Sequence, residues 1–272
     1  MERGWPRADC IATLAANTRQ IKLGVIPLST PLRHPLLLAH QLATIDVLSP
    51  GRLLVSPSIG KGGPEGQREF ANCGVPFAER GARLSEMLQV MKRLWTEPSV
   101  TFHGRFYQLD DATIFPKPIN RPIPQYVATG RDERALTRAG RYGDGWITTV
   151  SDVTEFTTDL QKVQAAALKA GRPVGDLAST GLYATFHLDH DGEAARADAP
   201  EHIRAYFGAH RRGETNDFFG SPSEIGQRLQ AFVDEGLTML IVRFVEQDAP
   251  KQVELLREAL SFTRSKTATS DS

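Results

Sequence analysis

The sequence contains little cysteine: two residues, Cys10 and Cys73, in a chain of 272. Because they lie far apart and form no repeated spacing, the sequence does not indicate the disulfide framework of a small secreted protein. A chain so poor in cysteine is typical of the cytoplasm, and we expect that location. With 40% hydrophobic and 24% charged residues, the chain has the balance of an ordinary globular protein.

Long apolar runs and an excess of one charge are also missing. No uninterrupted apolar run approaches the roughly 20 residues that a membrane span needs. The first ten residues, MERGWPRADC, lack the apolar core of a signal peptide. Lys and Arg together number 32, as do Asp and Glu, so the formal net charge is 0. This balance favours neither a nucleic acid nor an anionic membrane as a partner, and we expect neither.

Several motifs of catalysis and ligand binding are not found. The sequence has no G-x-S-x-G motif of a serine hydrolase and no G-x-G-x-x-G motif of a dinucleotide-binding fold. Its seven histidines show no zinc-binding spacing. We interpret the one close pair, His187 and His190, as solvated loop histidines, and we expect no metal site.

The clearest positive pattern extends over residues 21–60. Residues 21–28 are apolar and β-branched, and residues 53–59 are again strand-like. Residues 35–49, between them, have Leu38, Leu42 and Ile45 at helical spacing. Strand, helix and strand with short joints predict a βαβ unit with parallel strands. Both strands end in loops rich in Ser, Thr, Pro and Gly, which is typical of a site at the carboxyl ends of parallel strands.

The rest of the chain continues the alternation of strands and helices. Four more strands are expected, at 123–129, 146–150, 181–188 and 238–245, which makes six in all. An amphipathic helix is expected over 82–95, a hairpin over 100–109, and an exposed helix with a loop over 193–217. No linker interrupts the pattern. We predict a single domain over residues 1–264 and a disordered tail over 265–272.

These residues resemble the luciferase-like flavin-dependent oxidoreductases. The marks of the resemblance, in chain order, are Leu23-Gly24-Val25, Pro35, Ala39, Ala43-Thr44-Ile45-Asp46, Leu48-Ser49, Gly51-Arg52-Leu53, Glu69-Phe70, Gly74, Arg80, Glu86, Trp95, Gly104, Pro116 to Pro118, Gly130, Asp144-Gly145-Trp146 and Phe219-Gly220-Ser221-Pro222. The resemblance implies an α/β fold of the TIM-barrel type, (β/α)8. It also implies that the first two strands are lacking, because residues 21–28 match the third strand of the family.

The resemblance further implies where a flavin would bind. Relatives bulge the strand that corresponds to 21–28 against the flavin ring, often through a cis bond, so we expect a cis or bulged peptide at Ile26-Pro27. Ser29 follows and is expected either to contact the ring edge or the ribityl chain or to cap the next helix. Ser58 and Gly60 stand at the next strand end, where relatives are richer in glycine.

A phosphate site is implied at Thr129, Gly130 and Arg131. Residues 123–129 form an expected strand, and the helix is expected to start directly after Gly130. Backbone N–H groups at a helix start attract anions, and Arg131 adds a cation that can bind a phosphate. Relatives place the flavin phosphate on a similar turn.

The resemblance implies a cytoplasmic, homodimeric enzyme with reduced FMN or coenzyme F420 as cofactor. The first expectation is FMNH2-dependent monooxygenation of a small organic substrate, with a separate flavin reductase as a partner. F420-dependent hydride transfer, as a reductase or dehydrogenase, is the alternative. A truncated, non-catalytic flavin-binding relative is a third reading. His34 and His40 are titratable candidates, but no catalytic base is assigned.

Overall fold

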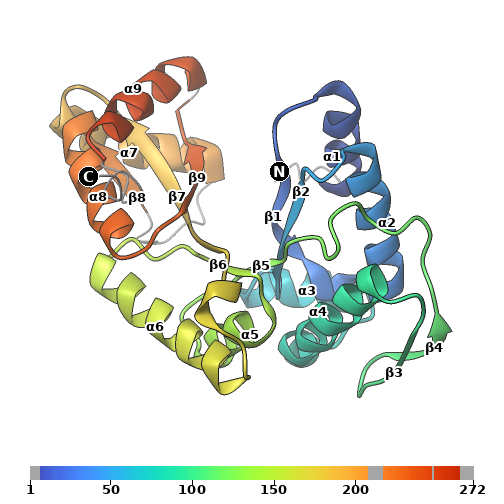
Figure 1. Cartoon of the computed structure of the whole chain (residues 1–272). Helices are drawn as coiled ribbons and strands as arrows, with labels where there is room; N and C mark the ends of the chain where they lie inside the picture. The colour runs from blue at the N-terminus through green and yellow to red at the C-terminus, as the bar shows by residue number, and fades with distance from the viewer. Residues whose placement is uncertain (1–6, 208–216, 247, 264–272) are drawn as a thin grey trace, which may run out of the picture. The chain divides into compact units, whose positions relative to one another are not determined.

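The structure is a computed structural model that describes residues 7–207, 217–246 and 248–263 (Figure 1). The described residues group into two compact units. The first contains residues 7–146 and 162–178. The second contains residues 147–161, 179–207, 217–246 and 248–263. The single domain expected over 1–264 stays a prediction, and the expected tail, 265–272, lies outside the described residues.

The first unit is built on the predicted βαβ pattern. Strand β1 (Leu23–Ser29) pairs in parallel with β2 (Leu53–Ser58), and helix α2 (Pro35–Leu48) connects them. A bridge between Val55 and Gln125 places β5 (Tyr126–Ala128) on the other side of β2. The strand order is therefore β1-β2-β5, with the three carboxyl ends at one edge. The βαβ prediction for residues 21–60 is confirmed.

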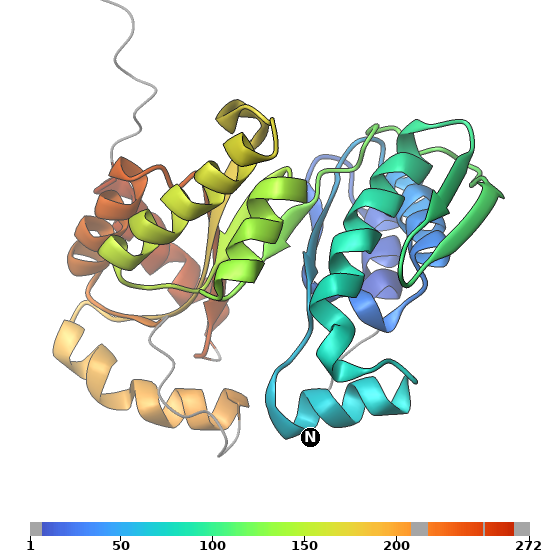
Figure 2. The ribbon, with the colours of Figure 1, turned by 90° about the horizontal axis from the view of Figure 1, so that it is seen from below.

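Helices cover one face of this sheet. Helices α1 (Arg7–Asn17), α2 and α4 (Arg80–Thr96) lie side by side (Figures 1 and 2). Helix α4 buries the predicted apolar stripe of residues 84–95, and the indole N–H of Trp95 donates to the carbonyl of Ala39 on α2 at 3.0 Å. The short helix α3 (Gly63–Asn72) follows β2, and the expected hairpin is formed by β3 (Val100–His103) and β4 (Gln108–Ala112).

The second unit is organised around the long strand β7 (Ser179–Leu188). Parallel to it lie β9 (Met239–Phe244) and β8 (Asp217–Gly220), and Thr185 and Phe186 pair with both. Helices α7 (Gly192–Phe207), α8 (Pro222–Asp234) and α9 (Ala249–Ser261) complete the unit, with α8 packed on α9. The apolar side chains of these strands and helices, led by Phe186, Phe218 and Phe232, form its core.

Two elements of this unit correct the sequence expectation. Strand β8 was not expected, because four residues are too few to show alternation. Helix α7 forms where an exposed helix was expected and is mostly exposed, yet its Ala195 and Ala199 are fully buried. Because alanine side chains are small, these residues do not form a recognisable apolar stripe in the sequence.

The remaining elements lie at or beside the divisions between the units. Strand β6 (Gly145–Thr148) matches the predicted strand 146–150. Helix α5 (Glu133–Tyr142) precedes β6, and helix α6 (Val153–Lys169) follows it. With β8, the described residues contain seven strands outside the β3–β4 hairpin, compared with the six predicted. None of the described helices combines the length and apolar character needed to cross a membrane.

Candidate functional site

The carboxyl ends of β1 and β2 are tied together by hydroxyl groups. Ser29 and Ser58 are register partners across the two strands. The hydroxyls of Ser58 and Thr30 each donate to the carbonyl of Leu28 at 3.0 Å. The backbone N–H of Gly60 in turn donates to the Ser58 hydroxyl at 3.3 Å. The loop after β2 is thereby held against the end of β1, and Ser29, Ser58 and Gly60 are brought together as the sequence predicted.

Gly60 occupies a position that other residues would not fit. Its φ of +81° is in the left-handed region, where side chains are strained. A Cβ at this position would lie 3.0 Å from the ring of Phe70 and 3.3 Å from the hydroxyl of Ser29. The backbone at Gly60 therefore packs closely against Phe70 and Ser29 at the sheet edge.

The Ile26-Pro27 step is both cis and bulged. The peptide bond is cis, and the register between β1 and β2 shifts between Val25 and Leu28. Both side chains are half-buried. The geometry expected here is confirmed, while contact with a flavin ring stays a prediction.

The turn after β5 differs in part from the expectation. The hydroxyl of Thr129 accepts a hydrogen bond from the indole N–H of Trp146 at 2.8 Å. Gly130 and Arg131 are exposed, and no other described atom lies within 4 Å of where a Cβ of Gly130 would be. The space beside this backbone is therefore open to a ligand.

The helix after this turn starts later than predicted. Helix α5 begins at Glu133, because Asp132 caps it by accepting the N–H of Ala135 at 3.2 Å. Asp is a strong N-cap residue, a preference that the expected start after Gly130 left out. Two acidic side chains, Asp132 and Glu133, thus stand at this helix start. A phosphate bound here would rely on Arg131 and the backbone at Gly130 rather than on the first turn of α5.

Two basic residues, Arg33 and Lys61, follow the ends of β1 and β2 in the sequence. Arg33 donates to the carbonyl of Ser29 at 3.1 Å, and Lys61 lies 3.8 Å from Glu65 across a turn of exposed chain. The sequence reasoning missed Arg33. A basic residue three or four positions after a strand end is the signal that could have found it.

Of the histidines named from the sequence, His187 has other surroundings than expected. His34 caps α2, since its Nδ1 accepts the N–H of Leu36 at 3.3 Å, and His40 is exposed on that helix. The interpretation of His187 as a solvated loop histidine is wrong: it lies on β7 with 3% of its side chain exposed. His190 is exposed, as expected. His187 belongs to a cluster of side chains that sequence spacing did not reveal.

Comparison with known proteins identifies a family and several relatives. A family described as luciferase-like monooxygenase matches residues 9–235. The F420-dependent glucose-6-phosphate dehydrogenase of Kineococcus radiotolerans is 30% identical over 280 residues, covering 90% of this chain and 80% of that enzyme. The enzyme of the same name from Segniliparus rotundus is 35% identical over 173 residues. That match covers 61% of this chain and half, 50%, of the enzyme.

A solved structure has the same fold. The coenzyme F420-dependent tetrahydromethanopterin reductase of Methanopyrus kandleri superposes with a TM-score of 0.78 at 19% identity. The superposition covers 96% of this chain and 88% of the reductase. Likeness at this identity concerns the fold alone. It confirms the predicted class, an α/β fold of the TIM-barrel type.

Proposed function

Because the chain belongs to the luciferase-like monooxygenase family of oxidoreductases, we propose that it transfers a hydride between coenzyme F420 and a small organic substrate. One observation carries the proposal: the 30% identity to an F420-dependent glucose-6-phosphate dehydrogenase extends over 90% of the chain. A phosphorylated sugar is therefore the first substrate to test. The second relative and the superposed reductase, both F420-dependent by name, support the same cofactor.

This proposal selects the alternative that the sequence left second. The first expectation was FMNH2-dependent monooxygenation with a flavin reductase as partner. The relatives favour hydride transfer, which needs neither oxygen insertion nor a reductase. FMN binding by this chain is therefore an outcome that the experiment below is designed to detect.

The residues at the sheet edge fit an elongated, anionic cofactor. The loop that carries Gly60 packs against Phe70 and Ser29, which leave no room for a side chain at this position. Ser29 and Ser58 offer hydroxyl groups beside it. At the turn after β5, Gly130 leaves open space, and Arg131 supplies a cation for a phosphate.

Each group has a distinct task in this proposal. The bound deazaflavin supplies the hydride-transfer chemistry, and the protein supplies its orientation and a pocket with little water. Ser58 holds the loop after β2 in place, because its hydroxyl bonds both Leu28 and Gly60. Thr129 is oriented by Trp146, and Arg131 anchors the phosphate end. Ile26 and Pro27 present the bulged edge of β1 to the ring.

The test is direct binding of F420 and of FMN to the purified chain, by fluorescence titration. We expect F420 to bind more tightly than FMN, and Arg131→Ala to weaken F420 binding by about tenfold, the loss of one charge-assisted contact. Arg134→Ala is the matched control: it removes an exposed arginine from the first turn of α5 and should leave the affinity unchanged.

Turnover completes the experiment. F420 mixed with glucose 6-phosphate and the protein should lose the visible absorbance of its oxidised form. Binding of FMN in place of F420 would favour the monooxygenase reading. Binding of F420 without turnover of any phosphorylated sugar would support the cofactor and contradict the substrate class. Binding of neither F420 nor FMN would overturn the proposal.

A further inference from the structure

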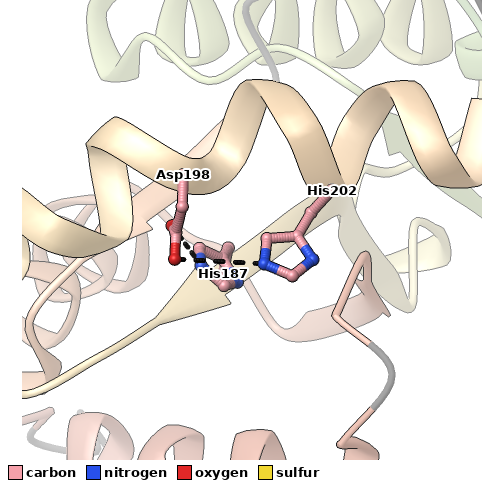
Figure 3. Close-up of side chains that lie close together, drawn as sticks. All are labelled: His187, Asp198 and His202. Carbon is pink, nitrogen blue, oxygen red and sulfur yellow. Dashed lines mark hydrogen bonds and ion pairs between the residues drawn. The ribbon is translucent and has the colours of Figure 1, made fainter.

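A compact group of metal-ligating side chains lies in the second unit, apart in sequence from every residue assigned to the cofactor. His187 is the penultimate residue of β7 and is buried. Asp198 and His202 stand four positions apart on α7, so they share one face of that helix. Figure 3 shows both projecting from α7 toward His187. Strand and helix thus bring two imidazoles and one carboxylate to the same place.

From this geometry we propose that His187, Asp198 and His202 bind one divalent transition-metal ion, of which Zn²⁺ is the first to test. Nε2 of His187 lies 2.7 Å from Oδ1 of Asp198, and Nε2 of His202 lies 3.9 Å from Oδ2 of that carboxylate. The two imidazole centroids are 4.6 Å apart. One ligand atom from each residue lies within 4.8 Å of those of the other two.

These separations suit tetrahedral coordination after small movements. With metal–ligand bonds near 2.0–2.2 Å, two ligands of a tetrahedral ion are about 3.4 Å apart. The separations of 2.7 and 3.9 Å stand on either side of that value. Small side-chain rotations would therefore bring the three ligand atoms to these separations, and His202 and Asp198 are exposed enough to make them.

Residues behind His187 orient its ring for this role. Nδ1 of His187 is buried, has no hydrogen-bond partner among the described residues, and lies 3.6 Å from Oε2 of Glu246. Gln252 donates to Glu246 and also bonds the N–H and carbonyl of Leu188, at 2.9 and 2.8 Å. With a metal on Nε2, the ring proton would lie on Nδ1, where the carboxylate of Glu246 can accept it, an arrangement common behind zinc-bound histidines.

The donor set decides which ions fit. Two imidazoles and one carboxylate suit Zn²⁺ and its first-row neighbours, whereas Mg²⁺ and Ca²⁺ prefer sets made of oxygen alone. Three protein ligands leave one position of a tetrahedral ion for water or another small ligand. A bound ion would also join α7 to β7, since its ligands come from both elements.

The experiment measures Zn²⁺ binding to the full chain, purified without a histidine tag, by calorimetry. Cys10 and Cys73 are replaced by serine in every sample, because thiols bind zinc as well. We expect one ion per chain. Asp198→Asn and His202→Ala should each weaken binding by at least about 100-fold, and Glu246→Gln by about 10-fold, as for a residue that positions a ligand.

His190→Ala is the matched control, since His190 is exposed near the end of the same strand and lies outside the cluster. It should bind Zn²⁺ as the parent does. Circular dichroism verifies that each variant folds, and Co²⁺ replaces Zn²⁺ to report tetrahedral coordination by its visible absorption. Equal affinity in His202→Ala and the parent, or a loss in His190→Ala, would overturn the proposal. So would a parent that binds no Zn²⁺, which would make the cluster an ion pair only.

The proposal of a metal site is independent of the cofactor proposal. The metal titration uses no F420, and its variants replace none of the residues assigned to F420. Failure of one proposal therefore leaves the other standing.

Discussion

The hydroxyl of Ser58 donates a hydrogen bond of 3.0 Å to the backbone carbonyl of Leu28, and so joins the carboxyl end of β2 to that of β1. The same oxygen accepts the N–H of Gly60. Two residues earlier on β2, the hydroxyl of Ser56 is fully buried and has no hydrogen-bond partner in the part of the chain that the structure describes. Two serines of one strand therefore differ in the hydrogen bonds that their hydroxyl groups form.

This difference predicts different effects on stability for the same substitution, Ser to Ala, at the two positions. Ser58→Ala should lower the free energy of unfolding by about 1 kcal/mol, because two hydrogen bonds are lost and the Gly60 N–H loses its partner. Ser56→Ala should leave stability unchanged or raise it, because it removes a buried polar group that gains nothing in the fold. Urea unfolding of both variants checks this. A larger loss in Ser56→Ala than in Ser58→Ala would contradict it.

Patterns within one stretch of chain made part of this structure predictable. The βαβ unit over 21–60 shows its strand and helix periods locally. Helix α8 begins with a capping box between Ser221 and Glu224, and its S-x-x-E pattern is visible in the sequence. The cis and bulged Ile26-Pro27 step followed from family resemblance rather than from local chemistry. The site residues at the ends of β1 and β2 came together because parallel strands place their carboxyl ends at one edge.

Features that depend on contacts between distant segments were not predictable. Asp198 and His202 show helical spacing in the sequence, but their approach to His187 depends on how α7 packs on β7. Strand β8 is four residues long and is defined by its pairing with β7 rather than by its own pattern. At α5 the prediction placed the helix start two residues early, because Asp132 acts as the cap.

Asp46 on α2 is buried, and its carboxylate accepts the N–H of Asn120 at 2.8 Å. Burial raises the pKa of Asp46 above its ordinary value of 3.8, against the opposing effect of these hydrogen bonds. An acid with a raised pKa favours folding below its unfolded pKa, and this contribution is lost as pH rises through the folded pKa. Asp46→Asn should therefore gain stability relative to the parent as pH rises from about 3 to about 7.

The contrasting variant at this position is Asp46→Ala. It leaves the Asn120 N–H without its acceptor and should be less stable than Asp46→Asn by about 1–3 kcal/mol over the whole pH range. Urea unfolding at several pH values measures both variants. A pH-independent difference between Asp46→Asn and the parent would contradict the assignment.

Glu224, by contrast, has a lowered pKa of about 2, caused first by the N–H of Ser221 and then by Arg196. A carboxylate with a depressed pKa stabilises the fold above its unfolded pKa of 4.5, and this contribution is lost as pH falls toward 2. Glu224→Gln should therefore be less stable than the parent at neutral pH, and the difference should disappear in acid. Glu254→Gln, which loses an exposed pair with Arg257, is the control and should change little. Thermal unfolding over this pH range distinguishes them.

Gly140 and Gly130 allow helix packing and the cofactor site to be tested with the same substitution, Gly to Ala. A Cβ on Gly140 would lie 2.1 Å from the carbonyl oxygen of Val163, so α5 and the adjoining turn of α6 would have to separate. Gly140→Ala should therefore cost about 1–3 kcal/mol, as overpacking does in other cores. Gly130→Ala meets no atom within 4 Å and should keep the stability of the parent, although its added methyl group occupies the space assigned to the cofactor phosphate. Unfolding in urea together with F420 titration separates the two effects: loss of stability belongs to the first variant, and loss of affinity at full stability belongs to the second. A destabilised Gly130→Ala, or a Gly140→Ala as stable as the parent, would show that these two backbones pack otherwise.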